Sequence, residues 1–233
     1  LSLHDALPIW MSGLFITGSG TEVGKTYVTC RLIRELRRSG RNARALKPVI
    51  TGFDPGTAAE SDTGLLLAAM DEVLDPASIG AISPWRFAEP ISPDMAASRE
   101  GHRLDAMEIA TFCRYAAPGG EDGVLMVEGI GGVMVPLNDR ETGLDWMVAL
   151  GWPVLLVSGS YLGTLSHTLT AVETIRARDL PLAGIVISES SDNPVPLEET
   201  ARTIRRFAGD VPVVTLPRDA TPEADGSLVE LLF

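Results

Sequence analysis

Short apolar runs of strand length alternate with longer segments of helical periodicity along this chain, and this alternation constrains its fold more than any other feature. The first run, Gly13–Gly18, is apolar and ends in glycine, as a buried parallel strand does. The predicted strands span residues 13–18, 44–50, 123–127, 153–158, 182–188 and 211–216, and the second is expected to end at Lys47-Pro48. The predicted helices span residues 25–38, 104–115, 164–177 and 197–207. Such alternation predicts an α/β fold, a mainly parallel sheet covered by helices on both faces.

The rest of the chain contains neither an internal repeat nor a linker rich in Gly, Ser or Pro, so we expect one domain. Residues 54–103 form the least regular segment, which we expect to decorate the carboxyl ends of the strands, where open α/β sheets bind ligands. Residues 1–10 lack the basic region and cleavage site of a signal peptide. We expect Met11 to be the natural start, residues 1–10 to be a non-native or disordered leader, and residues 11–233 to form the domain.

Charge and cysteine content exclude several classes of function. The 233 residues include 31 acidic and 19 basic side chains, a formal net charge of −12, which argues against broad electrostatic binding to nucleic acid or anionic membranes. No apolar run approaches the roughly 20 residues that cross a bilayer. Cys30 and Cys113 are too few for a disulfide framework and lack metal-ligand spacing, so we expect two buried thiols in a reducing cytoplasm.

A glycine-rich loop between the first predicted strand and the first predicted helix carries the strongest chemical signal. It has the sequence GSGTEVGKT over residues 18–26. Glycines leave backbone N–H groups free to converge on phosphates, the lysine (Lys25) reaches their β- and γ-oxygens, and the hydroxyl of Thr26 coordinates Mg²⁺. Phosphate loops commonly have four residues between their glycines, whereas five separate Gly18 from Gly24 here. The alternative, an ordinary strand-to-helix turn, therefore stays open.

Two more charged residues lie near the carboxyl ends of predicted strands, and a third, Asp62, lies in the irregular segment of residues 54–103. Glu128 follows an apolar strand and precedes a glycine turn, where a nucleotide-bound Mg²⁺ finds a second protein ligand. Lys47 lies on the same rim, where a second cation would neutralise charge on a transferred phosphoryl group. Asp62 is a candidate metal ligand by the same reasoning. Each also has a plainer reading: a loop residue or helix cap for Glu128, a surface lysine for Lys47, and a helix N-cap for Asp62.

Seven motifs, in the same order along the chain, resemble those of the dethiobiotin synthase family. They are GSGTEVGKT (18–26), LKPVITG (46–52), SDT (61–63), FAEPISP (87–93), VEGIGG (127–132), LGTLSH (162–167) and LAGIVIS (182–188). The five-residue glycine spacing of the loop is also similar to this family's own. The resemblance implies a single-domain, three-layer P-loop NTPase-like fold, and a homodimeric, cytoplasmic, ATP- and Mg²⁺-dependent ligase of biotin synthesis.

The resemblance also implies a reaction, ATP-dependent carboxylation and ring closure. One amine of 7,8-diaminopelargonate captures CO₂, supplied as CO₂ or bicarbonate, as a carbamate. The carbamate oxygen attacks the γ-phosphate of ATP, giving a carbamic–phosphoric anhydride. The second amine then closes the ring of dethiobiotin and expels phosphate, leaving ADP. Such steps need positioning and charge neutralisation more than a nucleophilic side chain, and the sequence has no evident Ser–His–Asp or Cys–His arrangement.

By the same resemblance, the matching motifs assign the site residues. The expected catalytic residues are Lys25, Lys47 and Thr21. The expected Mg²⁺ ligands are Thr26, Asp62 and Glu128. The expected contacts of ATP are Gly20, Thr21, Glu22, Val23, Gly24, Lys25, Thr26, Ser188 and Pro217. The expected contacts of the diamine substrate are Lys47, Thr51, Glu128, Gly131 and Gly163.

Two positions depart from the family pattern. Ser188-Glu189 stands where many members have Asn-Asp beside the nucleotide base, which leaves the base preference open. Ser166 replaces a common asparagine in the segment expected near the carboxylate tail of the substrate, at the start of a helix and near the subunit interface. We expect His167, in the same segment, to make a structural hydrogen bond.

The main alternative is an ATPase switch of the partition or division-site type, which acts on DNA or membranes. Those proteins carry a signature lysine five residues before the lysine of Gly-Lys-Thr, and here that position is Gly20. The chain also lacks a basic bias and a terminal amphipathic membrane helix. A synthetase of the amidotransferase type would lack FAEPISP and bring a glutaminase domain. A non-enzymatic nucleotide sensor fits poorly with three rim charges arranged for Mg-nucleotide chemistry, so a synthetase is favoured.

Overall fold

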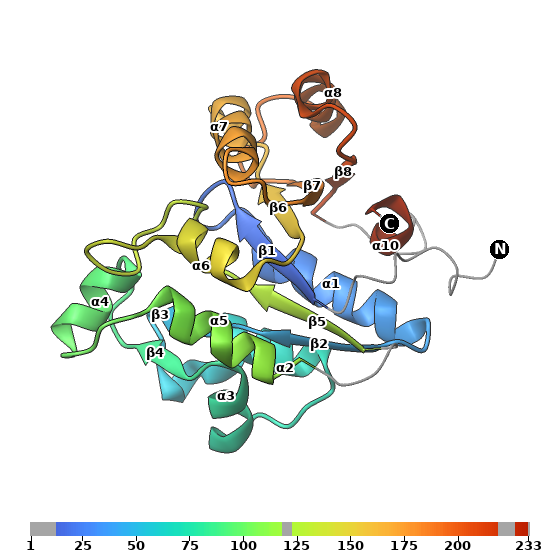
Figure 1. Cartoon of the computed structure of the whole chain (residues 1–233). Coiled ribbons are helices and arrows are strands. Elements are labelled where there is room, and N and C mark those ends of the chain that lie inside the picture. The colour runs from blue at the N-terminus through green and yellow to red at the C-terminus, as the bar shows by residue number, and fades with distance from the viewer. Residues whose placement is uncertain (1–12, 118–122, 219–226, 233) are drawn as a thin grey trace.

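The computed structural model describes residues 13–117, 123–218 and 227–232, so the predicted leader, residues 1–10, lies outside the described residues. Six strands form one sheet in the order β2-β5-β1-β6-β7-β8 (Figure 1), and every neighbouring pair is parallel. Their bounds are β1 Gly13–Gly18, β2 Asn42–Leu46, β5 Gly123–Glu128, β6 Val154–Ser158, β7 Leu182–Ser188 and β8 Val213–Leu216. The inner strands are covered on both faces, which explains their continuous apolar sequences.

Helices cover both faces of this sheet, with α1 and α10 on one side and α5 and α6 on the other (Figure 1). The helix bounds are α1 Lys25–Arg38, α2 Asp62–Ala69, α3 Pro76–Ile82, α4 Pro93–Arg99, α5 Ala106–Tyr115, α6 Gly143–Leu150, α7 Thr164–Arg176, α8 Leu197–Ala208 and α10 Leu228–Leu232. A 3₁₀ segment, η2, spans Pro55–Glu60. The predicted α/β architecture with a mainly parallel sheet is confirmed.

One predicted strand, residues 44–50, is wrong as a single element. The structure divides it into β2 and β3 (Val49–Thr51), and β3 pairs in parallel with β4 (Trp85–Phe87) in a separate two-stranded sheet. The break falls at Lys47-Pro48, because Pro48 has no N–H for a ladder and the backbone N–H of Lys47 donates to Ile82 O at 3.0 Å instead.

The segment over residues 54–103 is more regular than its sequence suggests, since it contains α2, α3, β4 and α4. These elements are short, and local capping defines two of their helices. The side chain of Ser61 accepts from Gly64 N at the start of α2, and Asp75 and Ser78 form a capping box at the start of α3. Such local signals are weaker in sequence than long apolar periodicity.

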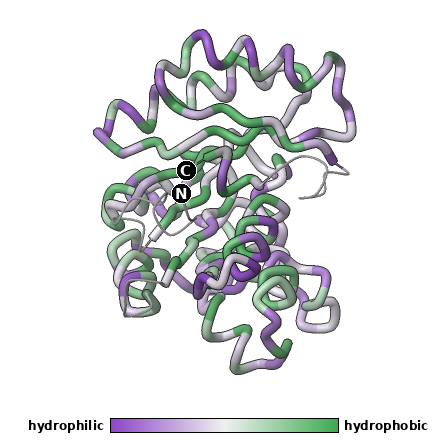
Figure 2. Tube along the Cα trace, turned by 90° about the vertical axis from the view of Figure 1, so that its right-hand side faces the viewer, coloured by the Kyte–Doolittle hydropathy of each residue, from purple (hydrophilic) through white to green (hydrophobic). Residues whose placement is uncertain are grey.

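The main apolar core of the described residues runs between the main sheet and its helices, and Ile50, Phe53 and Ala58 form a separate small cluster. Figure 2 shows hydrophobic residues following the central strands and hydrophilic residues concentrated on outer helical faces. Among the largest fully buried side chains, Phe15 of β1 and Trp146 of α6 meet edge to face, with ring centroids 4.8 Å apart. Both cysteines are free and buried, as predicted. Among the described residues, the helices are all too short or too polar to cross a membrane.

Candidate nucleotide-binding and catalytic site

The glycine-rich loop connects β1 to α1, and Gly24 is the residue immediately before the helix. Its φ is +94°, a left-handed conformation that glycine adopts without strain. A Cβ built on Gly24 would lie 2.5 Å from Ser188 Oγ, so close packing also requires glycine here. No side chain caps the start of α1 among the described residues, which leaves the first backbone N–H groups of the helix directed at the loop.

Lys25 is buried at the start of α1, and its ammonium bridges two backbone segments. Lys25 Nζ donates to Gly20 O at 3.1 Å and to Gly131 O at 2.9 Å. Burial, reinforced by the nearby charge of Lys47, lowers the pKa of Lys25 to about 8. Both acceptors are neutral carbonyls, so a bound polyphosphate would supply an anionic partner for this ammonium.

A second cluster joins α1, α2, β2 and β5 at the same rim. Lys47 Nζ lies 2.7 Å from Glu128 Oε1 and 2.9 Å from Asp62 Oδ2, and it also donates to Gly129 O at 3.0 Å. The three N–H groups of the ammonium therefore have three acceptors. Although burial lowers the pKa of Lys47, the Glu128 and Asp62 carboxylates raise it by more, and the net shift is upward.

Three oxygen-bearing side chains of this cluster suit a hard divalent cation. Thr26 Oγ1 lies 2.8 Å from Asp62 Oδ1 and 2.8 Å from Glu128 Oε1. Burial raises the pKa of Asp62, but the charge and hydrogen bond of Lys47, the hydrogen bond of Thr26 and the charge of Lys25 together lower it by more, so the net shift is downward and the carboxyl is ionised. The described residues contain no metal-binding group of three or more His, Cys, Asp or Glu side chains. Mg²⁺ suits the present set, because it takes one or two protein carboxylates and completes its shell with water and substrate phosphate.

The two clusters line one pocket of about 410 Å³. Most of the residues predicted to bind phosphate, metal or diamine lie around it. The lining is Thr21, Glu22, Gly24, Lys25, Thr26, Tyr27, Lys47, Ile50, Thr51, Asp62, Ile130 and Gly131. Glu128 lies beneath it, fully buried, and reaches the pocket through Thr26 and Lys47.

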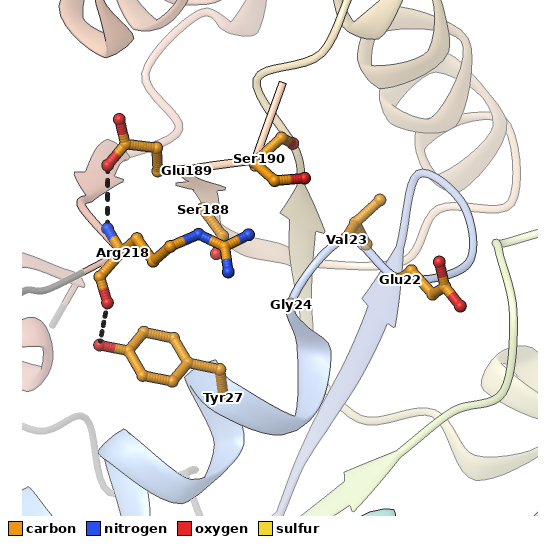
Figure 3. Close-up of a pocket in the computed structure, with 9 residues that line it drawn as sticks. Glu22, Val23, Gly24, Tyr27, Ser188, Glu189, Ser190 and Arg218 are labelled. Atoms are coloured by element: carbon orange, nitrogen blue, oxygen red, sulfur yellow. Dashed lines mark hydrogen bonds between the residues drawn. The ribbon is translucent and has the colours of Figure 1, made fainter. Parts of the chain in front are cut away.

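A second pocket, of about 260 Å³, adjoins the first at residues 22–27. Ser188, at the end of β7 and expected to contact ATP, lines it together with Glu189 and Arg218. Glu189 Oε2 accepts from Arg218 N at 3.0 Å, and Tyr27 OH donates to Arg218 O at 3.4 Å. Figure 3 shows the Arg218 side chain pointing into this pocket and the Glu189 carboxylate pointing away from its centre. The lining of this pocket and its position beside the glycine-rich loop suit a planar polar group such as a nucleotide base.

Some predicted positions lie outside the linings of these pockets. Pro217 is followed by Arg218, and it is Arg218 that lines the second pocket. Gly163 lies at the start of α7 with φ +100°, and Gly20 contributes its carbonyl to Lys25.

Asp62 is the first residue of α2, and the N-cap is Ser61, so the plainer reading of Asp62 as an N-cap is wrong.

Sequence reasoning did not single out Tyr27, Thr29 or Arg218 as site residues. Thr29 Oγ1 lies 3.0 Å from Glu128 Oε2 and orients that carboxylate. Tyr27 directly follows Thr26 of the loop motif, and Thr29 lies three residues after Thr26, one helical turn along α1. Extending the loop motif by one helical turn would therefore have included both residues. Arg218 has no such signal, because contacts across the fold bring it to the pocket. His167, expected to make a structural hydrogen bond, pairs through Nδ1 with Tyr161 OH at 2.8 Å.

Comparison with known proteins shows which family this chain belongs to. The family described as an AAA domain matches residues 12–221. An ATP-dependent dethiobiotin synthetase BioD of Methylobacterium nodulans is 48% identical over 221 residues, covering 93% of this chain and 97% of the relative. The protein of the same name from Acidiphilium cryptum is 48% identical over 203 residues, covering 87% and 91%. That from Caulobacter vibrioides is 45% identical over 223 residues, covering 96% and 100%.

Solved structures with the same fold are more distant in sequence. A ParA family ATPase from Chlorobium tepidum has a TM-score of 0.54 at 13% identity and covers 91% of this chain and 86% of its own. The septum site-determining protein MinD of Pyrococcus horikoshii, complexed with Mg-ADP, has a TM-score of 0.51 at 16% identity and covers 94% and 93%. At these identities the likeness establishes the P-loop NTPase-like fold alone.

Proposed function

Because the chain belongs to the family of ATP-dependent dethiobiotin synthetases, ligases of biotin biosynthesis, we propose that it carboxylates 7,8-diaminopelargonate with CO₂ and closes the ureido ring. The observation that carries this proposal is the convergence of two lysines, two carboxylates and a threonine hydroxyl on one rim, joined by the contacts of Lys47 and Thr26. Such a rim suits phosphoryl transfer, which depends on positioning and charge stabilisation.

The two lysines would share the phosphate chemistry. Lys25 would exchange its two carbonyl partners for β- and γ-phosphate oxygens, helped by the N–H groups at the start of α1. Lys47, held at the end of β2, would stabilise the carbamate and the transferring phosphoryl group. Thr21 lines the pocket beside them and would orient the carbamate. Thr26, Asp62 and Glu128 would hold Mg²⁺, which would neutralise charge on the phosphates.

The diamine would lie in the same pocket. Thr51 of β3 and Gly131 of the glycine turn, both expected to contact it, are part of the pocket lining. The substrate's carboxylate tail would reach the N-terminal end of α7, near Gly163 and residues 162–167, close to a twofold interface. Leu162 is 85% exposed there, which suits burial against a second copy in a homodimer. We propose that residues 11–233 form one such synthetase domain, working in the cytoplasm without nucleic acid or membrane partners.

Phosphate release from ATP tests the proposal directly. Release should require both 7,8-diaminopelargonate and bicarbonate, and mass spectrometry should identify dethiobiotin in equal amount with the phosphate. The Lys25→Ala variant, which loses the phosphate-binding ammonium, is the negative control. Release at the full rate without either co-substrate would favour an ATPase switch instead. Purified protein that makes no dethiobiotin under saturating substrates would overturn the proposal.

A further inference from the structure

A series of hydrogen-bonded hydroxyl groups, partly buried at Ser19 and buried beyond it, connects the phosphate loop to the N-terminal end of α7. Ser19 Oγ, in the loop, lies 2.9 Å from Ser158 Oγ at the end of β6. Ser158 Oγ in turn lies 2.5 Å from Thr168 Oγ1 and 2.9 Å from Thr164 Oγ1. Ser158 and Thr168 are fully buried and Thr164 is 3% exposed. Buried hydroxyls are costly unless each has a partner, so this series requires a reason.

The positions of the hydroxyl protons determine which group donates and which accepts along this series of hydrogen bonds. Thr164 Oγ1 donates to Gly159 O at 2.6 Å, and Thr168 Oγ1 donates to Thr164 O at 2.7 Å. Because carbonyls only accept, both threonine protons are committed. The hydroxyl of Ser158 therefore donates toward the threonine hydroxyl oxygens, of which Thr168 Oγ1 is the nearer. Ser158 Oγ in turn accepts a hydrogen bond from Ser19 Oγ. The hydrogen bonds run from the phosphate loop, through Ser158, into α7.

The position of Ser19 fits this arrangement. Counted back from Gly24 with the common spacing of four intervening residues, Ser19 stands where phosphate loops have their first glycine. Its backbone N–H donates to Val157 O at 2.9 Å and its side chain turns to Ser158, so both groups face β6. The contact of the Ser19 hydroxyl with β6, the neighbour of β1 in the sheet, thus explains why a hydroxyl stands at this position.

A second connection fixes the other side of the same β6–α7 turn. Ser160 N donates to Ser190 Oγ at 3.0 Å, and Ser190 N donates to Ser160 Oγ at 2.9 Å. Ser190 lines the second pocket, at the place for the nucleotide base. A Cβ on Gly159 would lie 2.6 Å from Ser190 Oγ, so the two turns are also closely packed. The turn before α7 is therefore attached both to the phosphate loop and to the base pocket.

From these contacts we propose that Ser158 is a positioning residue that sets the distance between the phosphate loop and the N-terminal end of α7. The proposal rests on the proposed function, in which the nucleotide occupies the loop and the substrate's carboxylate tail reaches α7. Ser158 touches neither substrate and acts through Ser19 on one side and Thr168 on the other. In-line transfer tolerates little displacement between reacting groups, so a loosened link lowers the rate even when the fold is intact.

The test is a double-mutant cycle of Ser19→Ala and Ser158→Ala in the full-length enzyme. We expect each single variant to lower kcat/KM for the diamine about tenfold, and the double variant to lower it little further, because both remove the same link. The Kd of Mg·AMP-PNP, measured without diamine, should change less than threefold. Ser158→Thr, which keeps the hydroxyl, should recover most of the activity. Independent effects of the two substitutions, or a KM and kcat within twofold of the wild type, would overturn the proposal.

Hydrogen exchange provides a readout that does not depend on the reaction. Mg·AMP-PNP should slow exchange of the backbone amides at residues 164–168 in the wild type, and this protection should be lost in Ser158→Ala. Thr174→Val is the matched control, because Thr174 Oγ1 donates to Thr170 O at 2.7 Å on the exposed side of the same helix. The control should keep both the protection and the activity. Equal losses in Ser158→Ala and Thr174→Val, or unchanged protection in Ser158→Ala, would reduce Ser158 to a merely structural residue. If the wild type makes no dethiobiotin but shows this exchange pattern, the proposed function fails and the link between loop and helix stands.

Discussion

Lys47 Nζ and Glu128 Oε1 lie 2.7 Å apart in the interior, with 3% and 0% of the two side chains exposed. A buried ion pair gains little free energy over an apolar pair of the same size, but removing one partner leaves an uncompensated charge. Thr29 and Gly129 satisfy further atoms of the pair, and Thr26 and Asp62 connect it to the pocket. We therefore explain the presence of this buried ion pair by the phosphoryl chemistry proposed for the pocket, not by a gain in stability. The surrounding hydrogen bonds keep its buried charges paired.

Lys25→Ala and Lys47→Ala should both reduce turnover but should differ in stability. Each removes a cation expected to stabilise transferred charge, so we expect kcat to fall by about 10²- to 10³-fold, measured as phosphate release. Lys47→Ala leaves Glu128 buried without its cation and should cost about 3–5 kcal/mol of unfolding free energy. Lys25 contacts two carbonyls, and burial already disfavours its charged form, so Lys25→Ala should leave Tm nearly unchanged. Near-normal turnover in both variants would contradict the mechanism.

Asp62→Asn should raise the Mg²⁺ requirement. The loss of one carboxylate from the set of Thr26, Asp62 and Glu128 should increase the Mg²⁺ concentration for half-maximal activity by about 10- to 100-fold. Glu128→Gln should do the same, with an added loss of stability through Lys47. Asp139→Asn, which changes an exposed carboxylate outside the pocket lining, is the control. An unchanged Mg²⁺ titration in Asp62→Asn would remove Asp62 from the metal site.

The sequence predicted the elements that have strong local signals. Residues 13–18 and 25–38 have the predicted bounds, because a continuous apolar strand, a glycine loop and an amphipathic helix follow one another there. The end of the strand at Lys47-Pro48 was predicted, but the separate strand β3 after it was missed, since β3 depends on pairing with β4, which is distant in sequence. The short helices of residues 54–103 were missed because caps and tertiary packing define them.

In the candidate site, too, some features could be predicted from the sequence and others could not. Lys25 and Thr26 follow from a loop motif, and the structure brings them beside Lys47, Asp62 and Glu128, which come from three other segments. Their mutual distances could not be predicted from one sequence, because they depend on how β2, β5 and α2 align at the sheet edge. Arg218 reaches the second pocket through the backbone contacts with Glu189 and Tyr27; family resemblance pointed to the adjacent Pro217, but no local motif singles out Arg218 itself.

Neither cysteine should react with thiol reagents in the folded enzyme. Burial raises the pKa of both Cys30 and Cys113 to about 12, so at pH 8 only about one thiol in 10⁴ is ionised. Nitrothiobenzoate release from Ellman's reagent should be negligible in native protein and should reach two equivalents in guanidinium chloride. Rapid labelling of one native thiol would show that the region around it opens in solution.

Glu35→Gln should destabilise the enzyme through the C-terminal helix. Glu35 on α1 accepts from Arg31 Nε at 2.7 Å, and its other oxygen accepts from Ser227 Oγ at 2.9 Å and Val229 N at 3.1 Å, which fastens α10 to α1. Hydrogen bonds to a charged group contribute about 1.5–3 kcal/mol, so we expect a loss of that size and a Tm lower by about 5–10 °C. Glu199→Gln on the exposed side of α8 should change stability by less than about 1 kcal/mol. Equal unfolding curves for the wild type and Glu35→Gln would exclude this role.

Arg218→Ala should weaken ATP binding without affecting the binding of the phosphates alone. The backbone of Arg218 is fixed by Glu189 and Tyr27, and within the described part of the chain its guanidinium has no hydrogen-bond or ion-pair partner, so it is available to a base in the second pocket. Stacking and cation–π contacts of this kind contribute about 1 kcal/mol, so we expect the Kd of Mg·ATP to rise about five- to tenfold by calorimetry. The Kd of magnesium tripolyphosphate, which has no base, should stay the same. Arg202→Ala removes an exposed arginine of α8 and should alter neither constant. If Arg218→Ala weakened both ligands equally, Arg218 would act through the overall charge of the site and the second pocket would lose its assignment as the base site.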